Sequence, residues 1–114
     1  MKETVFATYE RESTLWPRAN YFYVAQDWTK MECVVFDYTD EIDNIREFGV
    51  RYWRDGVDVT EEEIERVYGR PYMVRLTNNR GTNSKGFRFA TKDEANEFWK
   101  CIMNHKVLKG WHRV

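Results

Sequence analysis

Apolar side chains in this sequence follow two different spacings, and these spacings constrain the fold more than any other feature. Between Thr4 and Glu10 the spacing is every second residue, which is typical of a strand. Val5, Ala7 and Tyr9 are expected on one face of this strand, and Phe6 and Thr8 on the other. Near the end of the chain the spacing is every third or fourth residue, which is typical of a helix. Together the two spacings predict an α+β domain.

Further strands are expected where the alternation recurs between turn-forming residues. They are predicted at 21–26, 31–38, 50–54, 72–77 and 86–90. The first two would form an antiparallel hairpin about the polar turn at 27–30, preceded by a loop at 12–20. Asp55-Gly56 is a typical turn sequence, and the last eight residues would form a short strand or a docked tail.

A short helix is expected after the strand at 31–38. Thr39 is predicted to be its N-cap, and Gly49 to end it. Its buried face would consist of Ile42, Ile45 and Phe48.

Two more helices begin at sequences with capping-box spacing, Thr60 with Glu63 and Thr91 with Glu94. Gly69 would end the first of them. The second has the widest apolar stripe in the chain, formed by Ala95, Phe98, Trp99, Ile102 and Met103. The expected order of elements is therefore βββ-α-β-α-ββ-α.

Length and composition predict one domain with an aromatic core. A chain of 114 residues buries roughly two-thirds of its unfolded surface, which is enough for a single core over residues 1–114. Aromatic residues make up 17% of the chain, and Leu is scarce. No apolar run is long enough to span a membrane, and the opening residues do not resemble a signal peptide, so we expect a cytoplasmic protein. Cys33 and Cys101 are expected to be reduced and buried.

Charge is divided unequally along the sequence. Residues 1–63 carry 7 basic and 15 acidic side chains, whereas residues 64–114 carry 11 basic and 4 acidic ones. No acidic residue lies between Arg66 and Lys92, although the whole chain has a net charge of only −1. Two interpretations stay open. The halves neutralise each other through surface ion pairs, or the basic half attracts an anionic partner.

The basic half includes the hairpin predicted from the strands at 72–77 and 86–90. If Val74 and Leu76 face the core with Phe87 and Phe89, the alternation points the arginines of these strands outward. The connecting segment 78–85 is predicted to be a long binding loop. The expected anion-binding residues of this basic hairpin and its flanks, 70–92, are Arg70, Arg75, Arg80, Lys85, Arg88 and Lys92. Four of them, Arg75, Arg80, Lys85 and Arg88, are expected on one outward face of the hairpin and its loop.

The sequence contains no recognisable catalytic constellation. His105 and His112 lie near its end without a pattern that links them to a nucleophile, and no zinc-binding pattern occurs. Gly81 and Gly86 have the spacing of a phosphate-binding loop, but the Lys and Ser or Thr that such a loop needs do not follow. We therefore expect a binding protein without a cofactor or metal, and not an enzyme.

Two functional hypotheses follow. In the first, the basic hairpin binds nucleic acid, or a nucleic-acid-handling protein, mainly through contacts to phosphates or other anions. In the second, the chain is an accessory protein that inhibits or adapts a host protein, because its composition resembles that of accessory proteins of large bacteriophages. The surface for the second function would be acidic or rich in Trp, with Asp40, Asp43, Glu61, Glu62, Trp53 and Trp111 as its expected residues and Trp16 and Trp28 as further candidates.

Overall fold

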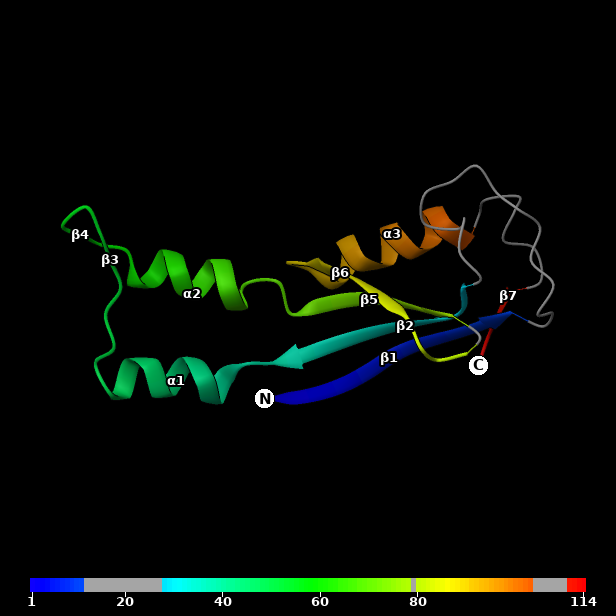
Figure 1. Ribbon diagram of the computed structural model, residues 1–114, viewed down its shortest axis with the longest axis horizontal. Helices are drawn as coiled ribbons and strands as arrows, with labels where there is room; N and C mark the ends of the chain where they lie inside the picture. The colour runs from blue at the N-terminus through cyan, green and yellow to red at the C-terminus, as the bar shows by residue number, and fades with distance from the viewer. Residues whose placement is uncertain (12–27, 79, 104–110) are drawn as a thin grey trace.

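The computed structural model describes residues 1–11, 28–78, 80–103 and 111–114. These residues form a small α+β domain, which confirms the expected fold class (Figure 1). Its elements are β1 (Lys2–Arg11), β2 (Trp28–Asp37), α1 (Thr39–Glu47), β3 (Trp53–Arg54), β4 (Val57–Asp58), α2 (Thr60–Tyr68), β5 (Tyr72–Asn78), β6 (Ser84–Phe89), α3 (Lys92–Met103) and β7 (Trp111–Arg113).

Five of the strands form one antiparallel sheet in the order β6-β5-β2-β1-β7. The predicted hairpin between 21–26 and 31–38 is wrong, because β1 and β5 pair with the two edges of β2. The segments 12–20 and 21–26 themselves lie outside the described residues. For the end of the chain, a short strand or a docked tail was predicted. It forms a short strand, β7, which pairs with β1.

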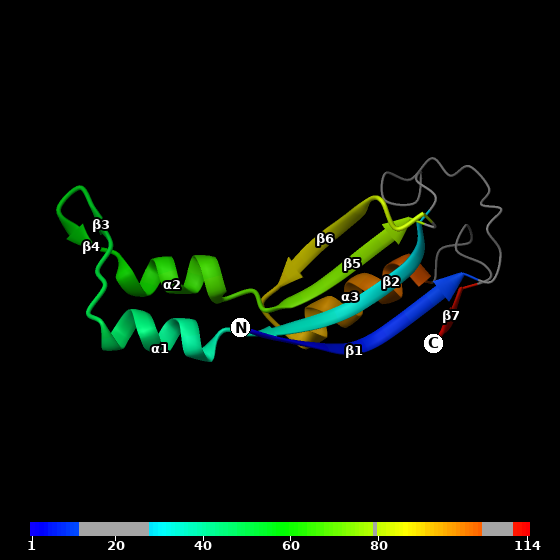
Figure 2. The ribbon, with the colours of Figure 1, turned by 60° about the horizontal axis from the view of Figure 1, so that its bottom comes forward.

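Helix α3 covers one face of this sheet (Figure 2). Its stripe is buried as predicted, with Ala95 and Ile102 almost fully enclosed and Phe98 packed 4.8 Å from Phe87 and 5.2 Å from Phe89 between ring centroids. The side chain of Met103 lies outside the described residues. The larger cluster of buried side chains lies between this face and α3, and a smaller one, formed by Val34, Phe36 and Met73, lies on the other face. Burial of each large apolar side chain contributes about 1.5–3 kcal/mol, so the α3 face stabilises the fold most. No helix among the described residues is both long enough and apolar enough to cross a membrane.

A bulge in β1 changes which residues face α3. The register with β2 shifts between Val5 and Ala7, so Phe6 is the extra residue of the bulge. Phe6 therefore packs against the core with Ala7 and Tyr9, whereas Val5 lies on the other face and is 49% exposed. The prediction that Val5 shares a face with Ala7, and Phe6 with Thr8, is wrong because strict alternation does not allow for a bulge.

The segment 39–68, which we call the arm, projects beyond the end of the sheet. Helices α1 and α2 lie side by side in it and are joined through the small β3–β4 hairpin (Figures 1 and 2). Asp55 and Gly56 have φ angles of 51° and 77°, as expected for the turn that their sequence predicts, although the strand before it is shorter than 50–54. The arm gives the molecule its elongated dimensions of 53 × 27 × 27 Å.

Neither predicted threonine is the N-cap of its helix: Tyr38 and Val59 take these positions without a side-chain cap bond, and Thr39 and Thr60 are the first helical residues. Asp37 Oδ1 accepts hydrogen bonds from the backbone N–H and hydroxyl of Thr39, at 3.0 and 2.5 Å. Asp58 accepts the equivalent bonds from Thr60, at 3.0 and 2.6 Å. The capping box of Thr60 with Glu63 is not formed, because Thr60 is the first residue of α2 and its hydroxyl oxygen accepts instead from the Tyr52 N–H at 3.0 Å. In α3, the Thr91 hydroxyl does accept the predicted bond from the Glu94 N–H at 3.2 Å.

The arm has a thin core of its own. Val59 and Ile64 are buried, while Ile42 and Ile45 are only half-buried. The prediction that Phe48 completes this core is wrong, since its side chain is 75% exposed. Gly49 ends α1 and Gly69 caps α2, as predicted.

The two cysteines have different environments. Cys33 on β2 is fully buried, as expected, whereas Cys101 on α3 is exposed, so the prediction that both are buried is wrong for Cys101. Cys101 precedes Ile102, and a helix that buries the one side chain turns its neighbour outward.

Candidate functional site

The basic residues of the predicted hairpin do not lie on one face. Arg75 and Arg88 point away from α3 as expected, but Lys85 pairs in register with the buried Leu76 and therefore lies on the α3 side. The Lys85 ammonium is 5.4 Å from the ring centroid of Phe87 on that side. The expectation of one basic face fails because Lys85 and Arg88 are three residues apart on a strand, where side chains alternate.

The connection between β5 and β6 is shorter than predicted. The strands pair as far as Thr77 and Ser84, and the Asn78 N–H donates to the Asn83 carbonyl at 3.1 Å. Asn78 Oδ1 accepts bonds from the N–H groups of Thr82 and Asn83, at 3.0 and 3.2 Å. The turn is therefore organised by Asn78, and the prediction of a long loop over 78–85 is wrong.

Arg75 is already neutralised within the fold. Its guanidinium donates to Glu32 Oε2 at 2.6 Å and lies 3.7 Å from Glu3. Burial alone would raise the pKa of Glu32, but hydrogen bonds from Lys30 and Arg75 outweigh it and leave this pKa below its usual value. At this position the two halves of the sequence neutralise each other.

The other predicted basic residues are spread over the molecule. The Arg88 guanidinium donates to the Tyr38 hydroxyl at 2.9 Å and lies 4.6 Å from the ring centroid of Phe36, yet the side chain is exposed. Arg70, between α2 and β5, and Arg80, in the β5–β6 turn, are also exposed. The hairpin thus does not gather its cations into one site.

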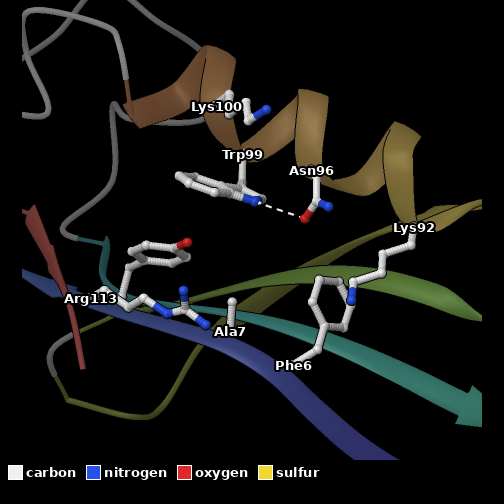
Figure 3. A pocket seen from close by; sticks show the side chains of 8 residues that line it. Phe6, Ala7, Lys92, Asn96, Trp99, Lys100 and Arg113 are labelled. Atoms are coloured by element: carbon white, nitrogen blue, oxygen red, sulfur yellow. Dashed lines mark hydrogen bonds between the residues drawn. The ribbon is translucent and has the colours of Figure 1, made fainter.

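A groove between α3 and the β1–β7 edge of the sheet does gather cations (Figure 3). It encloses a cavity of about 260 Å³. Its lining consists of Phe6, Ala7, Tyr9, Lys92, Asn96, Trp99, Lys100 and Arg113, and we call it the α3 groove. Of these residues, sequence reasoning had selected Lys92 alone.

Aromatic rings held by backbone geometry and packing form the walls of the α3 groove. The β1 bulge turns Phe6 toward α3, where the Lys92 ammonium lies 5.3 Å from its ring centroid. The Trp99 ring lies 4.5 Å from that of Tyr9 between centroids, and its indole N–H donates to Asn96 Oδ1 at 3.1 Å. These contacts fix the Trp99 ring before any ligand enters (Figure 3).

The charges that line the α3 groove are all positive. Lys92 and Lys100 come from α3, and Arg113 reaches in from β7 (Figure 3). Lys100 also lies 3.7 Å from Glu97, but both side chains are largely exposed, so this pair neutralises little of the charge. Burial raises the pKa of Tyr9, and the charge of Arg113 opposes part of this effect. The groove therefore combines a positive potential with accessible ring surface.

The acidic residues of the second hypothesis all lie on the arm, but in two groups at its opposite ends, because α1 and α2 run in opposite directions (Figure 1). Asp40 and Asp43 lie on α1 and Glu61 and Glu62 on α2, with the exposed Trp53 at the far end. The remaining Trp candidates do not belong to this surface. Trp111 is half-buried against the core on β7, Trp28 is buried, and Trp16 lies outside the described residues.

No group of three or more His, Cys, Asp or Glu side chains in the described part of the chain is arranged to hold a metal ion. Comparisons with protein-family models, curated proteins and solved structures found no match to this chain. Inference about function therefore depends on the chemistry of the α3 groove and of the arm.

Proposed function

We propose that this chain is a non-catalytic binding protein and that its α3 groove binds single-stranded nucleic acid. The observation that carries the proposal is the combination of three cations, three aromatic rings and no carboxylate in the lining of one groove. Lys92, Lys100 and Arg113 would contact phosphates, and binding would release the counterions of the nucleic acid. This interface replaces the basic hairpin as our preferred site, because Arg75 is paired with Glu32.

The aromatic walls favour a single strand over a duplex. Bases of a single strand are free to stack on protein side chains, whereas those of a duplex are stacked on one another. The half-buried rings of Phe6 and Trp99 offer such a surface, while Tyr9 is nearly enclosed and supports Trp99. Stacking contributes about 1–3 kcal/mol per base and tolerates any sequence, so we expect little sequence preference.

Fluorescence anisotropy with a labelled oligothymidylate tests this function. The triple variant Lys92→Gln, Lys100→Gln and Arg113→Gln should lose most of its affinity. Each phosphate contact to a single strand contributes about 0.7 to the slope of log K against log salt, so the slope should fall by about 2. The same oligonucleotide annealed into a duplex should bind more weakly to the wild-type chain.

A control variant removes the same charge elsewhere. Arg70→Gln, Arg80→Gln and Arg88→Gln together change three exposed cations outside the α3 groove and should leave most of the affinity. Phe6→Leu keeps the apolar contact but removes the ring, and should weaken binding about fivefold or more through lost stacking. If the control variant loses binding and the groove variant keeps it, the basic hairpin is the interface and the groove proposal is wrong.

A further inference from the structure

The far end of the arm exposes an apolar surface. Within residues 48–57, which we call the arm tip, Phe48 is 75% exposed, Trp53 66% and Val57 62%. Val50 and Tyr52, at 41% and 42%, are partly exposed there. Clustered exposed apolar side chains with polar residues around them are typical of interaction sites.

Charge restricts what can cover the arm tip. The arm carries ten acidic and four basic side chains, a net charge of −6, whereas the rest of the chain carries a net +5. The arm tip's own arginines, Arg51 and Arg54, pair with Asp58 and Glu63 at 3.6 and 3.0 Å. Next to the tip, Glu47 and Glu62 are exposed and take part in no ion pair within the described part of the chain. A symmetric dimer through two arms would bring these like charges together, which is unfavourable. The arm therefore suits a positively charged acceptor with apolar walls.

The chain itself contains an acceptor of this kind, the α3 groove. The groove has cations at Lys92, Lys100 and Arg113 and aromatic walls at Phe6 and Trp99. The arm projects from one end of the 53 Å molecule, while the groove lies beneath α3 and extends toward β7 at the other end (Figures 1 and 3). The arm therefore cannot enter the groove of its own chain, but a second copy can supply either surface.

We propose that the arm tip of one copy docks in the α3 groove of a second copy. Trp53 would pack against the groove's aromatic walls, while carboxylates of the arm would face the cations that otherwise meet phosphates. The contact joins two different surfaces, so it repeats head to tail and does not close as a two-fold dimer. The inference rests on the same groove as the proposed function, and arm and nucleic acid would compete for it.

Analytical ultracentrifugation of two charge-reversed variants tests this association. The arm variant carries Glu47→Lys, Glu61→Lys and Glu62→Lys, next to the arm tip, and the groove variant carries Lys92→Glu, Lys100→Glu and Arg113→Glu. The wild-type protein should increase in average mass with concentration, and each variant alone should stay monomeric. A mixture of the two should associate again, because the intact arm of the groove variant meets the intact groove of the arm variant, and the reversed charges of the other arm and groove also attract each other.

The apolar part of the contact has its own test and control. Trp53→Ser should weaken wild-type self-association at least about tenfold, which corresponds to about 1.4 kcal/mol. Val67→Ser should not weaken it, because Val67 is a half-exposed apolar residue of α2 outside the arm tip. Equal loss in both variants would contradict docking through the tip.

Three results would overturn the inference: a monomeric wild-type protein at all concentrations, self-association of the groove variant through its arm, or no complex in the mixture. These results are distinct from failure of the proposed function. The arm variant keeps its groove and should still bind oligothymidylate, which should also dissociate the wild-type assembly. If the mixed complex forms but no oligonucleotide binds, self-association stands and nucleic-acid binding fails.

Discussion

The ion pair between Arg75 and Glu32 decides whether the hairpin is free to bind anions, and a double-mutant cycle measures it. The Arg75 guanidinium donates to Glu32 at 2.6 Å, and the side chains are 31% and 13% exposed. Hydrogen bonds to charged groups contribute about 1.5–3 kcal/mol, whereas fully exposed pairs contribute about 0–1 kcal/mol. Arg75 is partly solvated, and Glu32 also forms an ion pair with Lys30 at 2.8 Å. We therefore expect a coupling energy between Arg75 and Glu32 of about 1–2 kcal/mol.

The variants are Arg75→Gln, Glu32→Gln and the double variant, and urea unfolding at neutral pH gives the free energy of each. Arg75→Gln should lower the free energy of unfolding more in the wild-type protein than in the Glu32→Gln variant, and the difference between the two losses is the coupling energy. Arg88→Gln is the control, because Arg88 contacts Tyr38 and Phe36 and should show no coupling to Glu32.

The pH dependence of the coupling provides a second check. The pKa of Glu32 is lower in the folded protein than its usual value of 4.5, so the pair's stabilisation is fully present above that value. It should be lost as the pH falls through the lowered pKa. A coupling near zero at neutral pH, or one unchanged in acid, would refute the argument that Arg75 is neutralised.

Two further predictions concern the core. Phe98→Ala should destabilise the fold by about 2–3 kcal/mol in urea unfolding. This is less than the cost of removing a fully buried ring, because Phe98 is only half-buried. An unchanged unfolding midpoint would contradict the packing of α3. Cys101 should react at once with a thiol reagent, whereas Cys33, whose pKa burial raises to about 12, should react only when the protein unfolds. Rapid labelling of both thiols would show that Cys33 is accessible.

The elements that were predicted correctly are those whose residue pattern lies within one short segment of the sequence. The α3 stripe follows helical spacing without interruption, and Val74 and Phe87 alternate as strand residues should. The Asp-Gly turn and the glycines that end helices are also local signals, because each depends on the conformation of only a few residues. Failures occurred where one residue changes the pattern, as when the β1 bulge moves Phe6 to the core face.

The candidate site was mostly missed because it is assembled from distant parts of the chain. Tyr9 and Arg113 meet only because β7 pairs with β1, and Trp99 joins them only because α3 packs across the sheet. The neighbouring pair Trp99-Lys100 was the one local signal of a basic aromatic site. Conversely, the basic hairpin stood out in the sequence, but its main arginine is paired with Glu32, a residue far away in the chain.

Photo-cross-linking tests the central claim most directly, because it identifies the side chain that touches a base. An oligothymidylate with one 5-iodouracil is irradiated with the arm variant, which cannot self-associate by its arm, and mass spectrometry locates the adduct. We predict adducts on Trp99 or Phe6, and their loss when excess unlabelled oligonucleotide is added. Adducts confined to residues outside the α3 groove, on the β5–β6 hairpin or the arm, would contradict single-strand binding in the groove.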